Sequence, residues 1–156
     1  MIKVEVSTVI RCPVEKVFAF VANFENLPKW AKDFLEVQEV GSAPGCAGAT
    51  YNCLVTFPGP ATISEFEIIE CIPNQKITYQ CERDRPVVPH GSFLFEPVAG
   101  GTKVTSSWQP EIGNAFGWWE GITASSIEKH TMDHLDNLKR LLESQAEGVD
   151  HFITMN

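Results

Sequence analysis

The sequence predicts an α+β fold, in which a seven-stranded antiparallel sheet wraps around a long C-terminal helix. From Phe34 onward, apolar and polar residues alternate for about 75 residues, as they do in consecutive strands. Residues 114–144 then contain no proline and carry apolar side chains at helical spacing. A chain of 156 residues, 44% of them hydrophobic, can bury the core of one such domain.

A strand and two short helices precede the alternating stretch. Every second residue from Ile2 to Ile10 falls on one largely apolar side, so residues 2–11 are expected to form a half-buried strand. Pro13 suits the first turn of a helix, and apolar residues follow it at spacings of three and four. A short helix is therefore expected from Pro13 to Ala22. A second is expected around Leu27 to Lys32, and it carries Trp30.

Turn sequences divide the alternating stretch into six strands. Pro58-Gly59-Pro60 and Gly100-Gly101 are the clearest of these turns. The six strands are expected at residues 34–42, 49–57, 61–72, 76–83, 90–98 and 102–110. Such short connections require an antiparallel meander, because parallel neighbours need long crossovers. No linker interrupts the chain, so we expect a single domain over residues 1–144 and a flexible C-terminal tail over residues 145–156.

The long helix becomes less bulky on its inward face toward its N-terminal end. Gly117 and Gly121 weaken its first turns, so its securely helical part is expected to start near Ile122. On a helical wheel the C-terminal half directs leucines inward, namely Leu135, Leu138, Leu141 and Leu142. The N-terminal half directs smaller or more polar side chains inward, namely Thr123, Ala124, Ile127, Thr131 and His134. This taper predicts either close packing of the backbones or a cavity for a ligand.

The supply of aromatic residues favours the cavity. Aromatic walls with a few hydroxyl groups suit a small hydrophobic or ring-bearing molecule, although each residue could instead belong to the core. The residues expected to line the cavity are Trp30, Cys53, Val55, Phe66, Ile68, Tyr79, Cys81, Phe93, Phe95, Ser106, Trp108, Trp119, Thr123, Ala124, Ile127, Thr131 and His134.

Five short phrases of the sequence are similar to those of a known superfamily. They are IRCPVEKVF at 10–18, FENLPKW at 24–30, FEPV at 95–98, GGTKVT at 100–105 and LKRLLE at 138–143. With the order of elements, they resemble the helix-grip fold of the START (SRPBCC) superfamily, in its bacterial polyketide cyclase/dehydrase-like branch. The resemblance spans residues 2–144 and implies a cavity. It does not imply a reaction, because members bind lipids, quinones, hormones or polyketides while others catalyse ring closure or dehydration.

Three side chains are candidates for acid–base catalysis by a polyketide cyclase or dehydratase. These are His134 together with Tyr79 or Glu120, although Glu120 could instead be a first-turn carboxylate favoured by the helix dipole. His130 and His134 have a spacing that can place two imidazoles on one metal ion. The sequence offers no third ligand, so no metal is expected, and no other cofactor is expected either.

Composition limits the partners. The chain has 12 Lys and Arg against 20 Asp and Glu, a net charge of −8, which argues against binding nucleic acid. Its apolar runs are far shorter than the roughly 20 residues of a membrane span, and its first residues do not resemble a signal peptide, so a cytoplasmic protein is expected. Its five cysteines form no CxxC pair. We expect a monomer or homodimer that binds a small hydrophobic ligand, with an enzyme or a protein-binding module as alternatives.

Overall fold

The computed structural model describes residues 4–41, 46–56, 61–81, 87–112 and 124–154. The elements of the N-terminal part are β1 (Val4–Ile10), α1 (Val14–Ala22), the short 3-10 helix η1 (Phe24–Asn26) and α2 (Leu27–Trp30). The strands that follow are β2 (Phe34–Gly41), β3 (Thr50–Val55), β4 (Thr62–Ile72), β5 (Lys76–Cys81), β6 (Val87–Val98) and β7 (Gly101–Ile112). The last element is α3 (Ala124–Thr154).

The strands form one seven-stranded sheet in the order β1-β7-β6-β5-β4-β3-β2. Every neighbouring pair is antiparallel, so the predicted fold class is confirmed. The β6–β7 hairpin turns at Gly100, whose φ of 86° is a conformation that glycine adopts easily. The β4–β5 turn uses Asn74 at φ 62°, a position that asparagine tolerates better than most residues.

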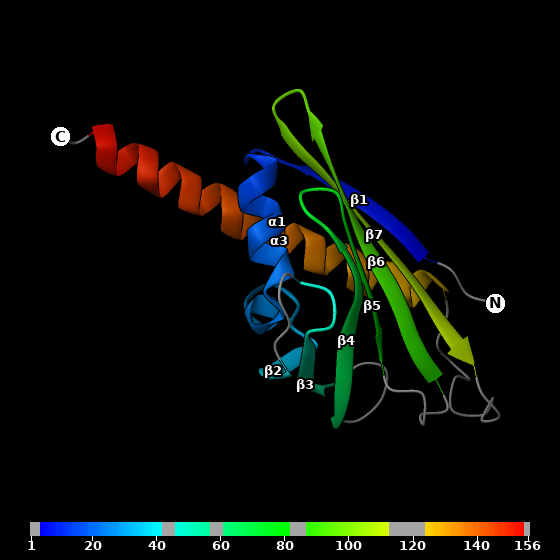
Figure 1. Cartoon of the computed structure of the whole chain (residues 1–156). Coiled ribbons are helices and arrows are strands. Elements are labelled where there is room, and N and C mark those ends of the chain that lie inside the picture. Colours follow the sequence, from blue (N-terminus) through cyan, green and yellow to red (C-terminus); the bar gives the residue numbers. More distant parts are fainter. Residues whose placement is uncertain (1–3, 42–45, 57–60, 82–86, 113–123, 155–156) are drawn as a thin grey trace.

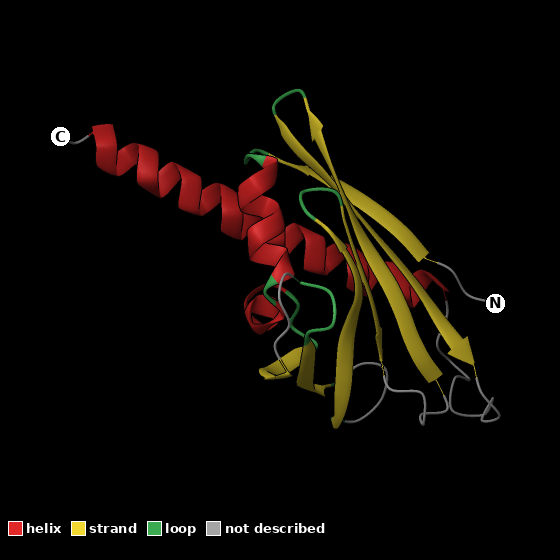
Figure 2. Ribbon diagram, in the orientation of Figure 1, coloured by secondary structure: helices red, strands yellow, loops and turns green. Residues whose placement is uncertain are grey.

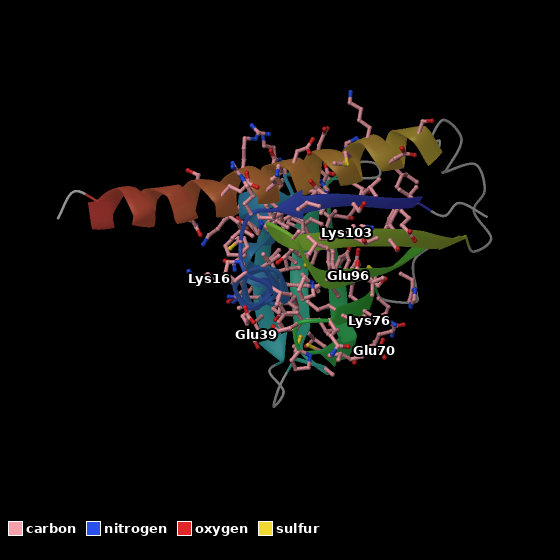
Figure 3. The ribbon with its side chains drawn as sticks, turned by 90° about the horizontal axis from the view of Figure 1, so that it is seen from above. Lys16, Glu39, Glu70, Lys76, Glu96 and Lys103 are labelled. Atoms are coloured by element: carbon pink, nitrogen blue, oxygen red, sulfur yellow. The ribbon has the colours of Figure 1, made fainter. Side chains whose placement is uncertain are left out.

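The helices cover one side of the curved sheet (Figure 1). The helix α3 runs alongside β1 (Figure 3) and also packs against α2. Polar contacts fasten it to the end of β1: Lys139 Nζ donates to the carbonyl oxygen of Val9 at 2.7 Å, and the backbone N–H of Arg11 donates to Glu143 Oε2 at 2.9 Å. The end of β1 is therefore attached to the middle of α3.

The core lies between the sheet and the three α-helices. From α3 it receives Leu135 and Leu138, which are fully buried, and Leu142. Leu141, which the helical wheel placed inward, is only half-buried and lies on the flank of α3. The first helix contributes Phe18, whose ring meets that of Phe95 edge-on at a centroid distance of 5.2 Å.

Several boundaries differ from the prediction, most of them by one to three residues. The long helix was expected to end near Ser144, but α3 continues to Thr154 and its last turns extend beyond the sheet (Figure 2). Once a helix is nucleated, each further residue costs little, and this segment contains no proline to stop it. The break expected after Ala22 is confirmed, because α1 ends there, but the residues that follow are not all irregular. The Asn23 side chain accepts a hydrogen bond from the Glu25 N–H at 3.1 Å and starts η1. The expected start of the long helix, near Ile122, lies outside the described residues.

The outer face of the sheet carries alternating charges. Lys103, Glu96, Lys76 and Glu70 come from the successive strands β7, β6, β5 and β4 (Figure 3). Glu96 pairs with Lys103 in register, and Lys76 forms an ion pair with Glu70 at 2.9 Å. This face is therefore suited to water, and the chemistry of interest lies on the other face.

Candidate functional site

Aromatic rings form a continuous row on the helix-covered face of the sheet. Tyr79 of β5 lies among three other rings, with centroid distances of 5.7 Å to Phe24, 6.0 Å to Phe66 and 5.6 Å to Phe93. Phe93 of β6 in turn meets Trp30 of α2 edge-on at 5.9 Å. The row thus leads from the centre of the sheet to the end of α2.

The register of β5 and β6 makes room for Tyr79. Its cross-strand partner is Gly91, and a Cβ atom at that position would overlap the hydroxyl oxygen of Tyr79. The absence of a side chain at Gly91 therefore lets the phenol lie across the neighbouring strand. Burial raises the pKa of Tyr79 well above its usual value, so the hydroxyl stays protonated and can donate a hydrogen bond.

A polar cluster joins the loop after α2 to the helix α3. Asp33 Oδ2 lies 3.1 Å from His130 Nδ1 and 3.0 Å from His134 Nε2. The backbone oxygen of Asp33 accepts two further hydrogen bonds, from the N–H of Thr56 at 2.9 Å and from its hydroxyl at 3.2 Å. Asp33 is thereby held from the end of β3 as well as from α3, and its carboxylate is 17% exposed.

Asp33 fixes the protonation pattern of the cluster. Burial on its own would raise the pKa of Asp33, but the hydrogen bond and charge of His134, followed by those of His130, outweigh burial and hold the pKa below its usual value. The carboxylate is therefore ionised at neutral pH and can only accept hydrogen bonds. Both imidazoles must donate to it, so His134 carries a proton on Nε2, and its neutral form has Nδ1 as an acceptor.

Trp30 connects this polar cluster to the aromatic row. Its ring meets the His134 ring edge-on, with a centroid distance of 6.5 Å and an interplanar angle of 88°. Its backbone oxygen accepts a hydrogen bond from Asn137 Nδ2 at 3.3 Å. The residue is 2% exposed, yet its indole Nε1 finds no acceptor within the described parts of the chain. Tyr79, Phe93, Trp30, His134 and Asp33 thus form one arc, which we call the aromatic–polar arc.

The predicted site residues occupy different depths. Ten are buried: Trp30, Cys53, Val55, Phe66, Ile68, Cys81, Phe93, Phe95, Ser106 and Ile127. Four are half-buried: Tyr79, Trp108, Thr131 and His134. Ala124 begins α3, but its side chain is outside the described part, and Trp119, Glu120 and Thr123 lie outside the described residues altogether.

The contacts and exposure of Thr131 and His134 show more about how these two residues are placed. The hydroxyl of Thr131 donates to the carbonyl oxygen of Ile127 at 2.8 Å, so its proton is used within α3 and is not offered to a ligand. His134 faces inward, as the helical wheel predicted, with 19% of its side chain exposed against 41% for His130 on the flank.

Sequence reasoning missed Asp33. The residue lies between α2 and β2, where no periodic pattern assigns a direction to its side chain. Its two histidine partners follow 97 and 101 residues later. The spacing of His130 and His134 was the only available signal, and it was weighed for a metal ion, which was not expected, and not for a shared carboxylate. Across the described ranges, no group of three or more His, Cys, Asp or Glu side chains is arranged to hold a metal ion.

A separate groove of about 670 Å³ opens beside the β4–β5 turn. Its lining is Val14, Ile72, Asn74, Gln75, Lys76, Leu94, Phe95, Glu96, Pro97, Lys103 and Thr105. It shares only Phe95 with the predicted site residues, and it includes three of the four charges of the outer face. It is therefore distinct from the aromatic–polar arc.

Solved structures share this fold over nearly the whole chain. A START superfamily protein from Mycobacterium smegmatis matches with a TM-score of 0.70 and 14% identity, covering 96% of this chain and 99% of the other. A protein from Thermus thermophilus matches with a TM-score of 0.72 and 15% identity, covering 92% and 98%. The di-domain ARO/CYC StfQ of the steffimycin biosynthetic pathway matches with a TM-score of 0.73 and 17% identity. The match covers 94% of this chain and 52% of the di-domain protein.

The sequence itself matches a family model but no curated protein. Among the described residues, no helix is both long and apolar enough to cross a membrane. The family model described as polyketide cyclase / dehydrase and lipid transport matches residues 1–143, in agreement with the START-like fold. The chain therefore belongs to the polyketide cyclase / dehydrase and lipid transport family.

Proposed function

We propose that the protein binds a small hydrophobic or aromatic molecule, of lipid, quinone or polyketide type, between its sheet and α3. The observation that carries the proposal is the aromatic–polar arc, in which a row of buried rings ends at a polar cluster on α3. Rings give large apolar contact, and a few polar groups at one end orient a ligand. The family description, with its cyclases and lipid transport, supports the same use of the fold.

The taper of α3 supports a ligand position near its N-terminal half. Three of the leucines on its C-terminal half are buried in the core. Thr131, two turns before Leu138, is smaller and only half-buried. Space beneath Thr131 would accept part of a ligand, whereas close packing there would exclude one.

A filling substitution tests this. Thr131→Phe should occupy the space, and it should weaken binding of the fluorescent probe 1-aminoanthracene at least tenfold with little loss of stability. Glu128→Phe, at an exposed position of the same helix, is the matched control and should leave binding unchanged. If Thr131→Phe instead destabilises the protein by the roughly 1–3 kcal/mol typical of overpacking, the helix is closely packed and the proposal is wrong.

Native mass spectrometry provides an independent test. Protein purified from its own host should carry a small organic molecule, whose mass would identify the class of ligand. Protein that arrives free of such a molecule, and that also fails to bind 1-aminoanthracene, would contradict the proposal.

One observation favours a second candidate function, that of a polyketide cyclase or dehydratase. His134 is oriented by an ionised carboxylate, an arrangement that prepares an imidazole for acid–base chemistry. In an aldol closure, His134 would take a proton from the carbon between two carbonyl groups, and that carbon would attack a ketone. The resulting alkoxide would take a proton from Tyr79, and water would leave in a later dehydration. Glu120, the other acid candidate, lies outside the described residues.

Turnover distinguishes the two functions. His134→Ala should abolish cyclisation of a poly-β-keto thioester if His134 is the base, while binding of 1-aminoanthracene should persist. Tyr79→Phe should lower the rate without loss of binding. Retained turnover in His134→Ala would reject the assignment.

A further inference from the structure

The indole N–H of Trp30 is the one side-chain polar atom that the described structure buries without a hydrogen-bond partner. Several polar groups near it have partners. The backbone oxygen of Trp30 accepts from Asn137, and the oxygens of Asp33 accept from Thr56, His130 and His134. Buried donors in folded proteins nearly always meet an acceptor, so this exception needs an explanation. Its position on the aromatic–polar arc supplies one.

The surroundings of the indole define what could pair with it. An indole N–H only donates, so the missing group must be an acceptor. Its ring neighbours are Phe93 and His134, and the indole N–H forms no hydrogen bond to the imidazole of His134. The indole is 2% exposed and packs against the apolar ring of Phe93, so burying a negatively charged acceptor, such as a carboxylate, beside it would be costly. A neutral oxygen on an apolar ring system satisfies all of these conditions.

We propose that the indole N–H of Trp30 is the hydrogen-bond donor that orients the ligand, and that the ligand is a flat apolar molecule bearing a neutral carbonyl oxygen. This inference rests on the proposed binding function and narrows its ligand class from hydrophobic molecules in general to aromatic ketones and quinones. In this arrangement the rings of the ligand continue the row formed by Tyr79 and Phe93. The carbonyl oxygen lies at the polar end, near His134.

The matched probes fluorenone and fluorene test the inference. They have nearly the same shape, and they differ in a carbonyl group against a methylene group. A neutral hydrogen bond should make fluorenone bind the wild-type protein about 2- to 10-fold more tightly than fluorene in titration calorimetry. Trp30→Phe should remove this preference and change the affinity for fluorene less than twofold. Phe20→Leu, at a half-buried position of α1 outside the expected lining, is the control and should keep the preference.

The outcomes separate the inference from the proposed function. If wild-type protein binds both probes equally, or if Trp30→Phe keeps the preference for fluorenone, the inference is wrong and the binding function stands. If wild-type protein binds neither probe, the binding function fails and the inference fails with it.

A second measurement needs no substitution at Trp30. In ¹H–¹⁵N spectra of the wild-type protein, the indole signal of Trp30 can be assigned through its contacts to Phe93 and His134. Fluorenone should move this proton downfield, as a new hydrogen bond does, while fluorene should not. Identical shifts with both probes would overturn the inference even if Trp30→Phe does not fold.

Discussion

Asp33→Asn is the substitution that tests the polar cluster most directly. The change keeps the size of the side chain but removes the charge that two imidazole N–H groups share. A buried hydrogen bond to a charged group contributes about 1.5–3 kcal/mol, and an exposed one about 0.2–1 kcal/mol. His134, 19% exposed, corresponds to the first case, and His130, 41% exposed, corresponds to the second.

The expected loss follows from these two contacts. Because the amide oxygen of asparagine can still accept one neutral hydrogen bond, we expect Asp33→Asn to cost about half of the combined value, roughly 1–2 kcal/mol at pH 7. For a domain of this size that corresponds to a melting temperature lower by about 2–8 °C. Urea denaturation followed by circular dichroism measures the free energy of unfolding, and calorimetry measures the melting temperature.

The pH dependence has a definite sign. The pKa of Asp33 is lowered in the folded state, so the carboxylate adds stability above its ordinary pKa of 3.8, and this contribution is lost as the pH falls through the folded-state value. The difference in unfolding free energy between wild type and Asp33→Asn should therefore become smaller below about pH 3.8. Asp133→Asn, on the exposed side of α3, is the control and should cost less than about 0.5 kcal/mol. If Asp33→Asn costs no more stability than this control, or if its difference from wild type does not change with pH, the cluster does not stabilise the fold in this way.

Three further outcomes are expected. Glu143 has its pKa held at about 2, chiefly by the hydrogen bond from Lys139, so its stabilising effect is present above pH 4.5 and lost toward pH 2. In Glu143→Gln the urea midpoint should vary less between pH 4.5 and pH 2 than it does in wild type. If the variant loses as much stability in acid as wild type does, Glu143 does not have this role. Gly91→Ala would place a Cβ atom against the Tyr79 hydroxyl and should cost about 1–3 kcal/mol in urea denaturation, whereas a wild-type midpoint would show that Tyr79 lies elsewhere. Burial raises the pKa of Cys53 to about 12, so iodoacetamide at pH 8 should label it only after unfolding, and rapid labelling of native protein by mass spectrometry would refute its burial.

Local signals in the sequence were sufficient for the architecture. Alternation and turn residues located all seven strands, and the helical wheel separated inward His134 from His130 on the flank. These predictions succeeded because each depends on neighbours within a few residues. The end of α3 could not be placed in the same way, because no capping residue or proline marks it and the preceding turns already nucleate the helix.

The polar cluster could not be predicted from local signals. Asp33 meets His130 and His134 only because α2, the start of β2 and the N-terminal half of α3 converge in space. Likewise, Trp30 was predicted as a lining residue from its aromatic character, but only the arrangement of its neighbours shows that its N–H lacks an acceptor among the described residues. Contacts of this kind join residues about 100 positions apart, and no periodicity carries that information.

The position of β1 affects how the chain folds as it is synthesised. β1 is made first, yet its sheet partner is β7, with Val4 opposite Trp108 and Ile10 opposite Thr102. The helix that packs along β1 follows later still. On the ribosome, β1 therefore has no strand partner while β2 to β6 can already form hairpins, and it can join the sheet only after β7 has been made. Such late closure between distant segments slows folding, so a nascent chain halted before β7 should remain open to proteases and chaperones.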